Sequence, residues 1–126
     1  MYTDAVVEHF SNPRNVGTIE NPNVVVKVGD PGCGDAILIF LKIADNVITE
    51  VKYKVYGCAA AIATTSMAST MVKGKTLEDA LEVTDEKVAE ALGGLPDEKM
   101  HCSNLSATAI RAAVTRYMHP PEEQGE

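Results

Sequence analysis

The sequence has few aromatic residues, few cysteines and no long apolar run. Its 126 residues include no tryptophan, two phenylalanines and three cysteines. No apolar stretch approaches the roughly 20 residues of a membrane-spanning helix, and the first residues lack the basic and then apolar regions of a signal peptide. The sequence therefore predicts a soluble protein of the cytoplasm that has no membrane partner.

Basic residues are also scarce. There are 11 Lys and Arg against 18 Asp and Glu, which gives a net charge of −7, and no basic cluster stands out. Because binding to a phosphate backbone needs a concentrated positive face, this balance argues against nucleic acid as a partner. The length suits one domain with one core, and residues 1–126 contain no internal repeat, linker or domain boundary.

The three cysteines are an odd number and lie far apart in the chain. This pattern fits a disulfide framework poorly and a reducing compartment well, so the thiols are expected to be reduced. On their number alone, inert thiols are about as good an explanation as reactive ones, because cysteine outside disulfides is among the most buried residue types.

Strand periodicity comes before helix periodicity along this chain. A helix and a loop are expected in 1–23, strands in 24–28, 36–43 and 47–56, and helices in 59–73, from 76, from 84 and in 103–118, with a loop opening at 95–96 and a flexible tail in 119–126. Asp45 and Asn46 form the turn of a hairpin. Strands followed by helices without regular alternation predict an α+β domain, with a small antiparallel three-stranded sheet covered by helices.

Residue alternation also predicts which surfaces are buried. The strand at 36–43 places Ile37, Ile39, Leu41 and Ile43 on one face, which the Ala-rich helix and the last helix are expected to cover. In the first helix, Tyr2, Val6 and Phe10 share the four-residue spacing of an apolar face. His9 and His119 lie away from any cysteine and are expected at the surface.

Each cysteine lies at the boundary of an expected element. Cys33 is flanked by glycines in a loop before a strand, Cys58 follows Gly57 where a strand gives way to a helix, and Cys102 precedes the last helix. A thiol at a helix N-terminus is near the positive end of the helix dipole, which favours the thiolate. This placement favours reactive cysteines over inert ones.

Two further ligand types lie beside the cysteines. Asp35 follows Cys33 by two residues, and His101 directly precedes Cys102. Taken singly, Asp35 would be a turn residue and His101 a surface or capping residue. Three thiolates with a carboxylate or an imidazole make a four-coordinate site suited to zinc or to iron-sulfur chemistry. Convergence of the three segments is a hypothesis at this point.

Five short segments of the sequence form a recognisable set. They are residues 12–17 (Asn-Pro-Arg-Asn-Val-Gly), 33–35 (Cys-Gly-Asp), 56–63 (Tyr-Gly-Cys-Ala-Ala-Ala-Ile-Ala), 72–76 (Val-Lys-Gly-Lys-Thr) and 99–103 (Lys-Met-His-Cys-Ser). Together they resemble the IscU and NifU N-terminal type of iron-sulfur cluster assembly scaffold. Their order and their spread over nearly the whole chain make the resemblance specific.

The resemblance implies a SufE/NifU-like fold and a scaffold or carrier protein rather than an enzyme. It implies that iron and a transient 2Fe-2S cluster are bound by Cys33, Cys58 and Cys102, with Cys102 as the persulfide acceptor. Asp35 would keep the cluster labile, and His101 would lie close to it. The partners would be a cysteine desulfurase, apo iron-sulfur acceptor proteins and, in the cluster-bound state, a second copy of the chain in a homodimer.

Two alternatives use the same cysteines. The first is a zinc-dependent sulfurtransferase of the SufU kind, a sulfur-accepting enzyme. By resemblance, those proteins carry an insertion before the last cysteine and lack the histidine beside it, unlike this chain. The second is a binding module in which zinc holds three loops together, although the chain has no Cys-x-x-Cys pair. Zinc could also occupy a scaffold site in purified protein.

Overall fold

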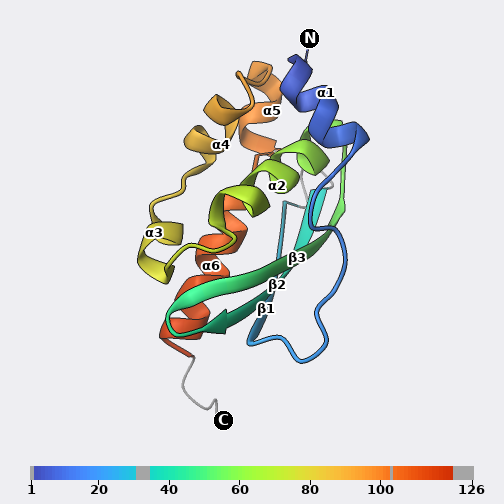
Figure 1. Cartoon of the computed structure of the whole chain (residues 1–126). Helices are drawn as coiled ribbons and strands as arrows, with labels where there is room; N and C mark the ends of the chain where they lie inside the picture. The colour runs from blue at the N-terminus through green and yellow to red at the C-terminus, as the bar shows by residue number, and fades with distance from the viewer. Residues whose placement is uncertain (1, 31–34, 103, 121–126) are drawn as a thin grey trace.

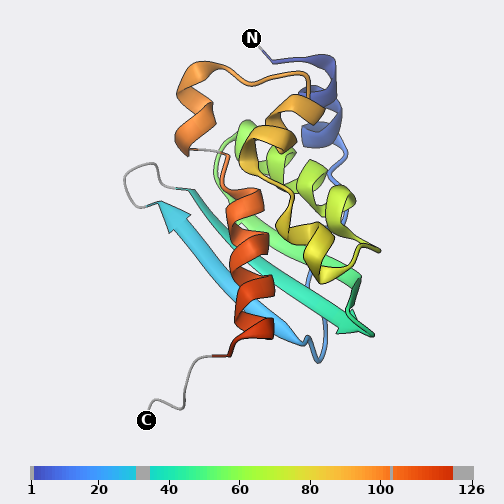
Figure 2. The same ribbon diagram turned by 90° about the vertical axis from the view of Figure 1, so that its left-hand side faces the viewer.

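A computed structural model describes residues 2–30, 35–102 and 104–120, without the side chains of Asp30, His101 and Cys102. Helices and strands lie in separate layers (Figures 1 and 2). Their order is α1 (Asp4–Ser11), β1 (Val24–Asp30), β2 (Asp35–Ala44), β3 (Val47–Tyr56), α2 (Ala59–Val72), α3 (Leu77–Leu81), α4 (Asp85–Ala91), α5 (Asp97–Cys102) and α6 (Ser106–Met118). No helix in these ranges is long and apolar enough to span a bilayer.

The sheet has three antiparallel strands in the order β1-β2-β3, as expected. The hairpin between β2 and β3 turns at Asp45 and Asn46, which have positive φ angles of 53° and 65°. Two such residues in succession are typical of the tight turns that match strand twist. In this hairpin Ala36 pairs with Tyr56, so the start of β2 lies beside the end of β3.

One face of the sheet forms the core. Ile37, Ile39, Leu41 and Ile43 of β2 are all buried, which confirms the predicted strand face. Helix α6 packs on β1 and β2, and α2 packs on β3. Figure 2 shows α6 lying across the sheet, so the two helices cover this face as the sequence predicted.

Helix α2 is buried on nearly every side because its residues are small. Ala60, Ala63, Thr64 and Ala68 are fully buried, and the helix contacts α1, β3 and α6. Small side chains let neighbouring elements approach closely, while threonine and serine hydroxyls can bond to carbonyls of the preceding turn. Thr65, for example, donates to Ala61 O at 2.7 Å.

The expected face of the first helix is partly wrong. Val6 is buried, but Phe10 is 44% exposed, and the surface position predicted for His9 is wrong because His9 is buried. The imidazole Nδ1 of His9 lies 2.7 Å from Ser66 Oγ in α2. Burial lowers the pKa of His9, so the folded state favours the neutral ring. The buried side of α1 therefore includes a polar contact between His9 and Ser66, whereas Phe10, which was expected there, faces solvent.

Ser66 also anchors the loop that follows α1. The Arg14 backbone N–H donates to Ser66 Oγ at 2.9 Å, and Asn15 Nδ2 donates to Ser69 Oγ at 2.8 Å. The ring of Tyr53 in β3 is fully buried beside Ser66, and burial raises the pKa of Tyr53 to about 12. Residues 12–17, which carry part of the family resemblance, thus have a structural role against α2.

The C-terminal third differs from the expectation in two respects. The segment predicted as a loop after Pro96 contains α5, and α6 begins at Ser106 instead of residue 103. Five residues separate helix α4 from α5, where Gly93 and Gly94 have φ angles of 84° and 107°. The short α5 lacks an apolar repeat long enough to be recognised in the sequence.

We predict that Ser66→Ala destabilises the fold by about 1–3 kcal/mol, because His9 and the Arg14 N–H each lose a buried partner. Chemical denaturation of the purified protein measures the change. Thr70→Ala in the same helix is the control, since Thr70 is exposed and bonds within its own helix. A Ser66→Ala cost no larger than that of Thr70→Ala would contradict this role.

Candidate metal centre

Asp35 begins β2 and is 7% exposed, so its carboxylate is largely withdrawn from water. Continuing the antiparallel register by one position places Asp35 opposite Gly57. A Cβ added to Gly57 would overlap Asp35 Oδ1. The carboxylate therefore lies directly against the backbone that leads into Cys58.

Gly57 is required here for space. Its φ is ordinary, but a side chain at this position would also approach Ala61 Cβ to 3.0 Å. Such distances are too short for a methyl group, so the Asp35 carboxylate would have to move away. The absence of a side chain at residue 57 is what allows Asp35 and the start of α2 to lie together.

Cys58 is the N-cap of α2, as predicted. Its backbone is extended, with φ of −83° and ψ of −179°, and its C=O accepts a hydrogen bond from the Ile62 N–H at 3.2 Å. The half-buried thiol therefore lies at the positive end of a 14-residue helix, where a negative sulfur is stabilised.

Lys99 of α5 provides a second positive charge at the same thiol. Its Nζ lies 3.5 Å from Cys58 Sγ, a contact between residues 41 positions apart. The charge of the Cys58 thiolate raises the pKa of Lys99, with smaller contributions from the hydrogen bond to Cys58 and from Tyr2 and Asp35. This contact brings α5 to the start of α2.

Lys99 is a site residue that no sequence pattern marks, although it belongs to the matching segment at 99–103. Recognition of α5 as a helix would have helped, because Lys99 and Cys102 are three residues apart and such residues share one side of a helix.

The remaining expected ligands are placed less completely. Cys33 lies outside the described residues, as do the side chains of His101 and Cys102. The backbone of Cys102 ends α5 and lies before α6. The prediction that Cys102 lies at a helix N-terminus is therefore wrong, and the dipole argument for its thiolate does not hold. Residue Cys102 follows a helix that the sequence did not predict.

The groups that the structure places at this site suit a soft, thiophilic metal with one harder ligand. It combines a thiol, a carboxylate withdrawn from water and a lysine that balances their charge. Within the described ranges, no three His, Cys, Asp or Glu side chains form a metal-binding group. Cys33 and the side chains of His101 and Cys102 lie outside those ranges.

A family model described as the NifU-like N terminal domain matches residues 1–124. The chain belongs to this family. Its relatives include an iron-sulfur cluster assembly scaffold protein IscU of Archaeoglobus fulgidus, 58% identical over 117 residues, which are 93% of this chain and 76% of that protein. The IscU scaffold protein of Azotobacter vinelandii is 43% identical over 122 residues, 94% of each chain.

Solved structures agree with the fold of this NifU-like chain. A NifU-like N-terminal protein from Brucella abortus superposes with a TM-score of 0.80 at 21% identity, covering 94% of this chain and 95% of that one. A structure titled as a putative assembly scaffold for the SUF system, from Fervidobacterium islandicum, superposes with a TM-score of 0.62 at 26% identity, covering 92% and 85%. The recognition of the family and the α+β fold class are thus both confirmed.

We predict that Gly57→Ala destabilises this NifU-like domain by about 1–3 kcal/mol, because the new methyl group displaces the Asp35 carboxylate. Chemical denaturation of the metal-free protein measures the change. The matched control repeats Gly57→Ala in an Asp35→Ala background, where the overlap with Oδ1 is gone and at least half of the penalty should vanish. Equal penalties in the two backgrounds would contradict the contact.

We also predict that Lys99→Met slows alkylation of Cys58 at neutral pH, because loss of the ammonium disfavours the thiolate. The rate is measured for the peptide containing Cys58 by mass spectrometry after timed iodoacetamide treatment. Lys99→Arg should retain most of the rate, and Lys73→Met, at the exposed far end of α2, is the charge control. Identical rates in all four proteins would remove Lys99 from the site.

Proposed function

We propose that this NifU-like domain is an iron-sulfur cluster assembly scaffold. It binds iron, accepts sulfur from a cysteine desulfurase, builds a transient 2Fe-2S cluster and passes it to apo acceptor proteins. The names of its relatives from Archaeoglobus fulgidus and Azotobacter vinelandii support this role. In this role the chain is a carrier and not an enzyme, and we assign it to the cytoplasm.

The meeting of three distant segments is the observation that carries the proposal. The start of β2 reaches the start of α2 through Asp35 and Gly57, and α5 reaches it through Lys99 and Cys58. Each of these segments contains or adjoins one of the three cysteines. An assembly site needs such convergence, because no single segment has enough ligands to hold iron and sulfide.

We assign Cys33, Cys58, Cys102 and Asp35 as the cluster ligands. Cys102 is the last residue of α5, the helix whose Lys99 contacts Cys58, so its backbone belongs to the segment that meets the start of α2. His101 adjoins Cys102 in the sequence and remains the alternative to Asp35 as fourth ligand.

Asp35 suits a cluster that has to be released. A carboxylate is a harder and poorer partner for sulfur-rich iron than a fourth thiolate would be. Three thiolates give the site its affinity, and the carboxylate completes the coordination with a weaker bond. Before iron binds, Lys99 balances the negative charge of the Cys58 thiolate. Bound iron would then supply that positive charge in place of Lys99.

Sulfur delivery is assigned to Cys102 on the basis of the family resemblance. The Cys102 thiolate attacks the outer sulfur of the desulfurase persulfide, and the desulfurase cysteine leaves as a thiolate. The sulfur carried on Cys102 is then reduced to sulfide by an external electron donor. A second copy of the chain would cover the finished cluster, giving a homodimer in the loaded state.

A zinc-dependent sulfurtransferase of the SufU kind is the second candidate. The similar Fervidobacterium islandicum protein carries the SufU name, although it is described as an assembly scaffold, and the same thiolates would bind zinc tightly. In that case the metal would remain bound while sulfur passes over a cysteine, and no cluster would form.

Anaerobic reconstitution with iron and sulfide separates the two functions. A scaffold should develop the absorption and Mössbauer signals of a 2Fe-2S cluster and transfer it to an apo ferredoxin, whereas a zinc enzyme should keep one zinc per chain and form no cluster. Metal content is counted in the same preparation. A protein that retains zinc and forms no cluster under these conditions would sink the scaffold proposal.

We predict that Asp35→Ala yields a cluster that survives longer and transfers more slowly, by roughly tenfold or more, because the weakest ligand bond no longer controls release. Loss of absorbance in the presence of an apo acceptor measures the transfer rate. Glu50→Ala on β3 is the carboxylate control and should behave as wild type. Unchanged lifetimes in Asp35→Ala would exclude Asp35 from cluster release.

A further inference from the structure

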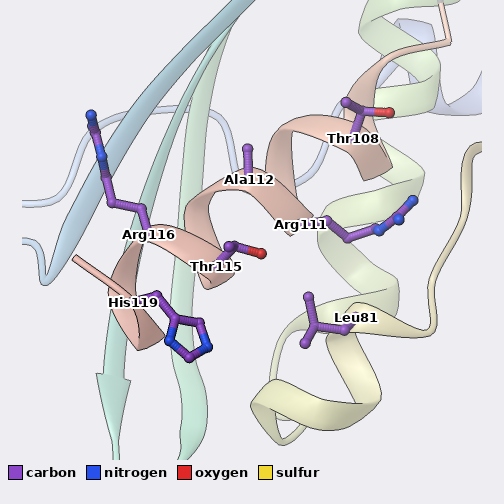
Figure 3. Close-up of a pocket in the computed structure, with 7 residues that line it drawn as sticks. All are labelled: Leu81, Thr108, Arg111, Ala112, Thr115, Arg116 and His119. Atoms are coloured by element: carbon purple, nitrogen blue, oxygen red, sulfur yellow. The ribbon is translucent and has the colours of Figure 1, made fainter. Parts of the chain in front are cut away.

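A shallow groove runs along the exposed side of α6 and is bordered by α3 (Figure 3). Its volume is about 770 Å³. It is lined by Leu81 of α3, by five residues of α6 from Thr108 to Arg116, and by His119, which directly follows α6. The five α6 residues and His119 are all exposed, and they repeat with the spacing of one helix face. The groove is therefore a continuous strip along the helix.

The two charged side chains that line this groove, Arg111 and Arg116, are both cationic. His119 lies at one end, and no Asp or Glu occurs anywhere in residues 103–121. The whole chain, in contrast, has 18 acidic against 11 basic residues. A positive strip on an otherwise acidic protein attracts negatively charged partners and repels positive ones.

The guanidinium groups are not neutralised within the described part of the chain. The one salt bridge recorded there joins Arg14 and Glu8. Arg116 donates to the Val25 carbonyl at 3.3 Å, which holds the side chain without cancelling its charge. Asp85 lies near the groove, but its carboxylate accepts from Thr108 Oγ1 at 2.6 Å and from the Ala107 N–H, so it caps α6.

The groove also has an apolar component. Leu81 and Ala112 lie between the polar residues, and Figure 3 shows Arg111 and Arg116 pointing to opposite sides of α6. A ligand lying along the helix would therefore rest on Leu81 and Ala112 and meet a positive charge on each side. This arrangement fits an elongated partner with an apolar seam and flanking carboxylates.

We propose that the α6 groove is a docking site for an acidic amphipathic helix of a partner protein. Helix-in-groove binding uses the same combination of an apolar seam and charged flanks. The groove extends along α6 toward the C-terminal end of that helix, whereas Cys58 and Lys99 lie where α5 meets the start of α2 (Figure 1). A docked partner would leave the metal centre uncovered, so the scaffold could be held in a complex while its cluster is exchanged.

The test measures fluorescence anisotropy of a designed helical peptide with leucines on one side and glutamates flanking them. We expect binding that weakens when the salt concentration rises from about 0.05 to 0.5 M, because screening shortens the range of exposed charges. Arg111→Glu should weaken binding roughly tenfold. Lys27→Glu makes the same charge change at an exposed position of β1 and should leave binding unchanged.

Several results would overturn the proposal. They are equal losses in Arg111→Glu and Lys27→Glu, equal binding of a peptide with lysine in place of every glutamate, and equal binding of polyglutamate without leucine. Complete competition by millimolar inorganic phosphate would instead assign the groove to small anions.

Circular dichroism checks that each variant is folded, and Arg111→Gln gives a milder change should Arg111→Glu unfold. Cluster reconstitution should be normal in Arg111→Glu, so failure here leaves the scaffold function separately testable.

Discussion

The antiparallel pairing of β2 with β3 is the constraint on which the site depends. Because Ala36 pairs with Tyr56, the next residues outward, Asp35 and Gly57, come to lie opposite one another. The tight turn at Asp45 and Asn46 starts the hairpin, and a shift of one residue between Lys42 and Ile43 then sets the register that reaches Asp35 and Gly57. A shift of one residue would turn Ile37 and Ile39 away from the core, so hydrophobic burial and site geometry are fixed together.

Helix α2 connects this end of the hairpin to the rest of the molecule. Its small residues let α1, β3 and α6 all pack closely on it, and its first turn begins directly at Cys58. The thiol is therefore held at the start of a helix that is buried on nearly every side, while Lys99 reaches it from the short α5.

The errors of sequence interpretation have physical causes. The sequence places His9 at the surface, but Ser66 lies across from it, and a buried imidazole is tolerated where a hydroxyl bonds it. Helix α5 is only six residues long and is stabilised by packing, so the sequence contains no apolar repeat that predicts it. Without that helix, Lys99 could not be connected with Cys58, and Cys102 was assigned to the start of α6.

The sequence by itself determined the strands, the buried face of β2, the main helices and the family, because alternation, turn residues and motif letters are local properties. It also identified Asp35 and Cys58 as neighbours of the same chemistry. Tertiary structure alone decided that Asp35 lies against Gly57, that Lys99 reaches Cys58 and that the arginines of α6 line one groove. These contacts join residues from different segments, and their formation depends on how the helices pack on the sheet rather than on any local pattern.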